Sequence, residues 1–243
     1  MAKNACVNVF NSLLTTIAIN ERHFIIKGAF MNQDALSKTL RHFPKLVLGL
    51  FIVAVGTKLN INANLGMNPW GTFHQGLSNL LGMRFGTASQ LTGLVILILS
   101  LFIKIYPGVG TVFNMFFIGF VVDLLPNFPI PDLFIWRLIA LSIGILLFNY
   151  GVYLYLSCEL GAGPRDGLMV GLVKLTGAKV STIRPLIEGS ILILGIVLGG
   201  AYGIGTIANV LLGGFILERI FNFFNFNAKR TQQMILTDYL LKS

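Results

Sequence analysis

The residues of this sequence best suited to chemistry are charged side chains that lie between long apolar runs. Arg165 and Asp166 stand in the string GAGPRDGLM (161–169), and Arg184 and Glu188 stand in STIRPLIEGS (181–190). Residues four apart share a helix face, so Arg184 and Glu188 can pair with each other. Because a charge at membrane depth is costly, such groups mark a substrate or ion pathway if the surrounding segments cross a bilayer.

Two interpretations of Glu188 remain open. Because it precedes the apolar run 191–198, its carboxylate can reach the membrane interface, or it can belong to a substrate or proton site.

The stretch NPWGTFHQGLSNLLG (68–82) carries uncharged polar groups. His74 with Ser78 and Gln75 with Asn79 recur at a spacing of four, which stacks them along a helix. A single histidine without a carboxylate at ligand spacing is more often a packing residue than a metal ligand or general base. We therefore predict a substrate-binding set without a metal ion or cofactor, made of Asn68, Trp70, His74, Gln75, Arg165, Asp166, Arg184 and Glu188.

The two polar stretches occupy matching positions in a repeat with an offset of 95 residues. Without a gap, 23 of the 85 pairs from Arg41/Trp136 to Leu125/Ile220 are identical, and eight of the eleven glycines in the first copy meet a glycine. Apolar helices align by chance, whereas glycine, proline and asparagine at fixed offsets do not. We predict two tandem repeats, 41–128 and 136–224.

The clearest repeated string is a helix start, because GVGTVFN (108–114) returns as GIGTIAN (203–209). Glycine permits the bend, threonine can cap the helix, and asparagine three residues later can reach back to the cap. The turns lack the strand and acidic partner of a dinucleotide site. The predicted helix-start turns comprise Gly108, Gly110, Thr111, Asn114, Gly203, Gly205, Thr206 and Asn209.

Composition assigns the repeats to a lipid bilayer. Hydrophobic residues make up 55% of the chain and charged residues 11%, whereas soluble domains carry about 25% charged residues. The apolar runs approach the roughly 20 residues that a helix needs to cross a bilayer. We predict an all-α fold, a polytopic membrane helix bundle with six to eight membrane helices, some of them short or half-spanning.

Each repeat is predicted to contain four helices, at 44–60, 69–81, 87–105 and 111–125 and again at 135–157, 164–176, 182–198 and 206–220. The second helix of each repeat starts with proline and covers only about 20 Å. If this helix spans, the chain has eight crossings and parallel repeats. If it re-enters, the chain has six crossings and inverted repeats. Loop charge favours cytoplasmic termini in both cases.

The ends of the chain are predicted to lie outside the bundle. Residues 1–40 read as a cytoplasmic leader, disordered in one interpretation, with Met31 as an alternative start, and residues 225–243 read as a cytoplasmic tail. The leader lacks the order of a cleaved signal peptide. Cys6 and Cys158 give neither a disulfide framework nor a CxxC metal site.

Several functional classes are excluded by the sequence. It contains no HExxH, GxSxG or Walker motif, so we expect no enzymatic activity. The net charge of +9 would favour nucleic acid in a soluble chain, but here the basic residues lie in short loops and at the ends. The expected surroundings are the lipid bilayer, with a small molecule as ligand and no nucleic acid. A homo-oligomer is left open.

In three of these strings the chain resembles the YczE/YyaS/YitT family of bacterial integral membrane proteins. LGMNPWGTFHQGLSNLLG, GVGTVFNMFFIGFVVDLL and LGAGPRDGLMVGL carry the resemblance, which covers about residues 41–224. The family usually has an acidic residue after Pro-Trp, where this chain has Gly71, so an ionic role there is lost or has moved. The resemblance implies a multi-pass protein of the bacterial inner membrane whose activity is poorly established.

These observations together predict a small-molecule transporter or exporter in which one repeat moves against the other. The alternative is a non-transporting accessory protein that binds and regulates a partner complex, and a membrane enzyme acting on lipid comes third.

Overall fold

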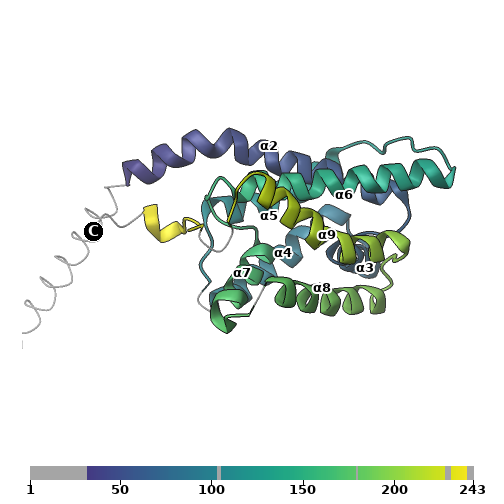
Figure 1. Ribbon diagram of the computed structural model, residues 1–243. Helices are drawn as coiled ribbons and strands as arrows, with labels where there is room; N and C mark the ends of the chain where they lie inside the picture. The colour runs from purple at the N-terminus through teal and green to yellow at the C-terminus, as the bar shows by residue number, and fades with distance from the viewer. Residues whose placement is uncertain (1–31, 103–104, 179, 228–230, 240–243) are drawn as a thin grey trace, which may run out of the picture. The chain divides into compact units, whose positions relative to one another are not determined.

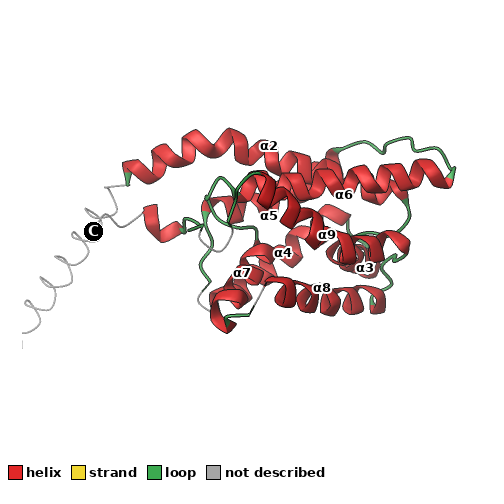
Figure 2. Cartoon of the chain, viewed as in Figure 1, coloured by secondary structure: helices red, strands yellow, loops and turns green. Residues whose placement is uncertain are grey.

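The computed structural model of the chain describes residues 32–102, 105–178, 180–227 and 231–239 (Figure 1). In these residues the chain forms helices joined by loops, without a strand (Figure 2). The helices are α2 (Gln33–Ala63), α3 (Pro69–Leu81), α4 (Phe85–Phe102), α5 (Val109–Leu124), α6 (Phe134–Leu156), α7 (Pro164–Thr176), α8 (Val180–Val197), α9 (Ile204–Phe223) and the 3-10 turn η1 (Leu236–Tyr239). The all-α prediction is confirmed, and the predicted bounds of α3 and α7 match to the residue.

The first helix is longer than predicted. α2 starts at Gln33, so residues 33–40 of the predicted leader are helical, and Pro44 lies inside the helix. Proline removes one backbone hydrogen bond. The residues before it include good helix formers such as Ala35 and Leu36, which extend the helix toward the N-terminus. Residues 1–31, with the rest of the leader, Cys6 and the alternative start Met31, lie outside the described residues.

The chain divides into two compact units, one comprising residues up to Arg41 and from Leu236 onward, the other His42–Ile235. In the first unit, the backbone N–H of Asn32 donates to the Tyr239 carbonyl at 3.2 Å, and the Asn32 side-chain amide donates to the Asp238 carbonyl at 3.2 Å. The hydroxyl groups of Thr39 and Tyr239 also hydrogen-bond. These bonds hold η1 against the start of α2.

Four helices of the described chain, α2, α4, α6 and α9, are long and apolar enough to cross a membrane, and α5 is a shorter apolar helix. Their outward-facing side chains are large and apolar, as at Leu99 on α4, Phe120 on α5, Leu146 on α6 and Leu211 on α9. Soluble monomers rarely expose apolar surface of this extent. The exposed faces of these helices therefore suit contact with lipid.

Glycines bring α2 and α6 together. A Cβ at Gly49 would lie 3.1 Å from the Gly151 carbonyl oxygen, and a Cβ at Gly56 would lie 2.8 Å from the Gly144 carbonyl oxygen. Small residues allow such close approach of two backbones. Because the earlier glycine of α2 meets the later glycine of α6, the two neighbouring helices run antiparallel (Figure 1).

The two helix-start turns make equivalent contacts. The Gly110 N–H donates to the Leu160 carbonyl at 2.7 Å, and the Gly205 N–H donates to the Leu65 carbonyl at 2.7 Å. In both cases the two donors and the two acceptors differ by 95 positions in the sequence. Each helix start therefore packs on the Leu-Gly turn that precedes the short helix of the other half of the sequence.

One detail of the predicted helix starts is wrong, because the N-cap positions are Gly108 and Gly203 rather than the threonines. The Thr111 hydroxyl accepts the Gly108 N–H at 3.0 Å and donates to the Ala162 carbonyl at 2.6 Å. Thr206 accepts the Gly203 N–H at 3.2 Å. Each threonine is thus the third helical residue, where its side chain satisfies the N–H of the cap residue.

Candidate functional site

The first turns of α3 and α7 line one cavity. Both helices begin with proline, which has no N–H to satisfy at that position. Asn68, Trp70 and Gly71 contribute from the start of α3, and Arg165 and Asp166 from the start of α7. The cavity has a volume of about 80 Å³. That exceeds the roughly 10–15 Å³ that one water needs and is well below the roughly 300 Å³ of a pocket for a drug-sized ligand.

Four other helices supply the walls of this central cavity. The polar residues among them are Thr57 of α2, Ser89 and Thr92 of α4, Asn114 of α5 and Tyr155 of α6. Tyr155 is 1% exposed and Asn114 is 9% exposed. Both halves of the sequence therefore contribute polar groups to the same cavity.

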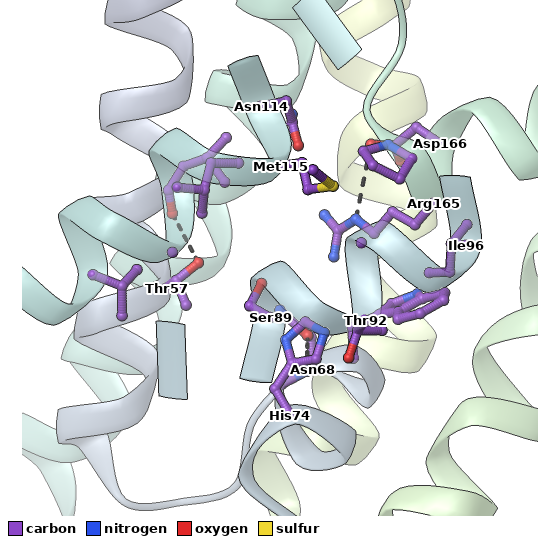
Figure 3. Close-up of a pocket in the computed structure, with 18 of the residues that line it drawn as sticks. Thr57, Asn68, His74, Ser89, Thr92, Ile96, Asn114, Met115, Arg165 and Asp166 are labelled. Atoms are coloured by element: carbon purple, nitrogen blue, oxygen red, sulfur yellow. Dashed lines mark hydrogen bonds and ion pairs between the residues drawn. The ribbon is translucent and has the colours of Figure 1, made fainter. Parts of the chain in front are cut away.

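Arg165 points into this space. Figure 3 shows its guanidinium between Asn114 and Met115 on one side and Ser89 and Asn68 on the other. Its Nε lies 3.8 Å from the Asp166 Oδ2 atom, which is too long for a hydrogen bond. Its guanidinium carbon lies 4.8 Å from the centre of the Phe148 ring, in cation–π contact.

Asp166 has a closer partner than Arg165. The Tyr155 hydroxyl donates a hydrogen bond to Oδ2 of Asp166. The carboxylate also lies in the first turn of α7, where the helix dipole favours a negative charge. The acid is thus held by the protein, while the guanidinium N–H groups of Arg165 face the cavity.

His74 lines the cavity among aromatic rings. The centre of its ring lies 6.3 Å from that of Trp70 and 5.7 Å from that of Phe85. In the described part of the chain, no group of three His, Cys, Asp or Glu side chains could hold a metal ion. His74 thus packs as an aromatic neighbour of the cavity.

The structure does not bring all eight predicted site residues together. Asn68, Trp70, His74, Arg165 and Asp166 line the central cavity. Gln75 instead accepts a hydrogen bond from the backbone N–H of Ala201, beyond the end of α8, at 3.3 Å. Arg184 and Glu188 pair at 2.9 Å and line a separate groove.

This groove lies between α7, α8 and α9 and has a volume of about 1070 Å³. Asp166 lines the groove as well as the central cavity. Glu218 of α9 and residues of the segment after α9, including Asn225 and Gln233, also line it. The groove therefore reaches from the end of α9 to the edge of the central cavity.

The groove exists because α8 and α9 are apart where the matching α4 and α5 touch. A Cβ at Gly86 would lie 2.1 Å from the Gly119 carbonyl oxygen, and the Gly86 N–H donates to Asp123 at 2.9 Å. A Cβ at Gly214, 95 positions after Gly119, would meet nothing within 4 Å. The two halves of the sequence thus differ at this seam.

Sequence reasoning missed Asn114 and Tyr155 as cavity residues. Asn114 was assigned only to a helix start, together with Asn209. Asn209 donates to the Gly205 carbonyl at 2.8 Å, whereas no side-chain hydrogen bond links Asn114 to a described residue. Because the two strings are so alike, nothing in the sequence distinguishes the two asparagines.

Comparison with known proteins yields a family. Residues 40–222 match the model of DUF6198, a family of unknown function. The chain belongs to this family. It is similar to the "Uncharacterized membrane protein YczE" of Bacillus subtilis (strain 168), with 39% identity over 174 residues, 70% of this chain and 80% of that protein. No solved structure matches the chain.

Two further relatives are uncharacterized proteins. One, from Haemophilus influenzae, is 33% identical over 178 residues, 73% of this chain and 82% of that protein. The other, YyaS of Bacillus subtilis (strain 168), is 28% identical over 176 residues, 70% of this chain and 88% of YyaS. The resemblance to YczE and YyaS is confirmed, and with its apolar helices the chain is a membrane protein.

Proposed function

We propose that this family member is a small-molecule transporter of the bacterial inner membrane, not an enzyme, with its binding site in the central cavity. One observation carries the proposal: the first turns of two 13-residue helices, α3 and α7, line the same polar cavity. Discontinuous helices whose N-termini meet between repeats are a recurrent way for transporters to bind a substrate. An arginine directed into a cavity at membrane depth is costly, and such residues usually serve a functional site.

The packing of α2 against α6 supports six crossings and inverted repeats. If α3 crossed the membrane, α2 and α6 would enter from the same side and run parallel. Their glycine contacts are antiparallel, which is the direction expected if α3 and α7 re-enter from opposite sides. The crossings in this proposal are α2, α4, α5, α6, α8 and α9, with both termini in the cytoplasm as loop charge favours.

The groove between α7, α8 and α9 is then the open route to the cavity. Asp166 lines both spaces, whereas the matching seam between α4 and α5 is closed by Gly86 and Gly119. Movement of one repeat against the other would close α8 onto α9 and separate α4 from α5. The cavity would thereby become accessible from the opposite side of the membrane.

The direct test is solute flux in proteoliposomes that contain the full chain. We expect saturable uptake of at least one class among small anions, amino acids, sugars and polyamines. Arg165→Gln should reduce that uptake about tenfold or more, the loss of roughly 1.4 kcal/mol of binding. The control is Arg137→Gln, which breaks only the Arg137–Asp132 pair at 2.7 Å with its 97% exposed Asp132 side chain.

Absence of flux for every solute class, with a monodisperse folded protein, would contradict the proposal. That result would favour the accessory function, in which the chain binds a partner complex without moving a solute.

A further inference from the structure

We infer that the ligand of the central cavity is a small monovalent anion, such as a halide, nitrate, formate or acetate. The inference rests on the proposed function, because it names the substrate class of the same site.

The hydrogen-bond donors that would hold the anion are the guanidinium N–H groups of Arg165. Arginine only donates hydrogen bonds, and the neighbouring carboxylate of Asp166 lies at 3.8 Å and accepts from Tyr155 instead. The other charged residues of this region, Arg184 and Glu188, form an ion pair with each other in the groove. The Arg165 guanidinium is therefore available to a ligand in the cavity.

An unpartnered buried amide is the second observation. Asn114 is 9% exposed, its side chain reaches the cavity beside Met115 (Figure 3), and no hydrogen bond links it to a described residue. The side-chain amide of Asn209, its counterpart 95 positions later, donates to the Gly205 carbonyl at 2.8 Å. The amide of Asn114 lines the cavity without a partner among the described residues, so it is available to hydrogen-bond a ligand there.

Two further donors of the cavity lining have no partner among the described residues. Trp70 is 5% exposed and lines the cavity together with Ser89, and neither side chain hydrogen-bonds to a residue that the structure describes. The indole N–H can only donate, and a hydroxyl can donate or accept. Asp166, the carboxylate of the lining, accepts one hydrogen bond, from Tyr155. A ligand that accepts hydrogen bonds therefore fits this lining better than one that donates them.

The two helix N-termini complete the balance of charge. The first turns of α3 and α7 both line the cavity, and each helix N-terminus carries about half a positive charge. Together these offset one monovalent anion, because Arg165 and Asp166 cancel. A second negative charge on the ligand would be uncompensated.

Size restricts the ligand further. At roughly 10–15 Å³ per water, the cavity volume of about 80 Å³ corresponds to about five to eight waters, which accommodates a halide or a one- or two-carbon carboxylate. Phe148, Met115 and Ile96 make part of the wall apolar.

The test is equilibrium binding to the purified full chain in detergent, read as the rise of the melting temperature with ligand concentration. The ligands are the sodium salts of chloride, nitrate, formate and acetate, with gluconate as the oversized anion and glycine as the zwitterion. We expect saturable stabilisation by at least one small anion and none by gluconate or glycine.

Three substitutions at the site and one control substitution make the result specific to the site. Asn114→Asp places a negative charge at the cavity and should weaken the anion affinity at least tenfold. Arg165→Gln should abolish binding, Arg165→Lys should retain part of it, and Arg137→Gln should leave it unchanged. If Arg165→Gln fails to fold, Asn114→Asp and Arg165→Lys still decide the matter.

The inference is overturned if none of the four anions binds, if binding is unaffected in both Asn114→Asp and Arg165→Lys, or if glycine binds better than the anions. Anion binding without flux in proteoliposomes would support the anion site and contradict the proposed transport function. Flux of a cation or neutral solute without anion binding would support the transport function and contradict the inference that the ligand is an anion.

Discussion

Thr111 joins the two halves of the sequence through one hydroxyl group. It accepts the N–H of Gly108 within its own helix start and donates to the carbonyl of Ala162 across the interface. Thr206 accepts the Gly203 N–H in the same way. Both threonines are buried, so these backbone groups have no water to replace a lost hydroxyl.

Thr111→Val should therefore destabilise the protein by about 1–3 kcal/mol for each buried group left without a partner. Thr111→Ser keeps the hydroxyl and should cost less. The measurement is thermal unfolding of the purified protein in detergent, and equal melting temperatures for the two variants would contradict the assigned bonds.

Single residues also mark the limit of sequence-based prediction of the site. Arg165 and Asp166 could be found because charge is conspicuous in an apolar chain. Gln75 and His74 were both predicted, yet only His74 lines the central cavity. Adjacent residues project about 100° apart around a helix, and the rotation of α3 about its axis depends on packing that the sequence does not state.

Among the helices, those with explicit start and stop residues were the most predictable. α3 and α7 begin with proline and end at Gly82 and Gly177, whose φ angles of 64° and 69° favour glycine. The predicted start of α2 at Pro44 is wrong, because proline favours a helix start but here lies inside the helix. Gly119 and Gly214 are identical residues in matching positions and gave no sign of the separation of α8 from α9, whereas Gly86, which contacts Gly119, is matched by Ser181.

This separation predicts unequal responses to one substitution at two matching positions. Gly119→Ala places a methyl group 2.6 Å from the Gly86 carbonyl oxygen and should destabilise the protein by about 1–3 kcal/mol, the usual cost of overpacking. Gly214→Ala meets nothing within 4 Å and should leave the melting temperature unchanged or raise it. Equal losses at both positions would contradict the open seam.

A larger side chain at the same open position tests the proposed movement. Gly214→Leu should fold normally, because the groove beside it is open, but should reduce flux at least about tenfold by preventing α8 from closing onto α9. The comparison is transport and melting temperature of this variant against the unmodified chain. Normal flux would show that this closure is not part of transport.

For the molecule as a whole, membrane sidedness was not decided by the sequence. The six- and eight-crossing interpretations leave equal numbers of basic residues on the non-cytoplasmic side, so the positive-inside rule could not separate them. The direction of α2 against α6 depends on contacts between residues about 100 positions apart, such as Gly49 with Gly151. Local sequence patterns do not determine the relative direction of two helices that are so far apart along the chain.

Labelling of two turns distinguishes the arrangements. In a background without Cys6 and Cys158, Arg84→Cys follows α3 and Ala178→Cys follows α7. With inverted repeats, a membrane-impermeant maleimide should label position 84 in intact cells and position 178 only after the cells are opened. Labelling of both positions from the same side would contradict six crossings.

The glycine contact between α2 and α6 is self-complementary: position 49 meets 151 while 56 meets 144, and 49 and 144, like 56 and 151, stand 95 residues apart. A half-length ancestor carrying both glycines would have matched a second copy of itself facing the other way. If the repeats are inverted, as proposed, such an ancestor would have needed to insert into the bilayer in both orientations. Fusion of two gene copies would then have freed each half to diverge, leaving an arginine on one side of the cavity and a tryptophan on the other.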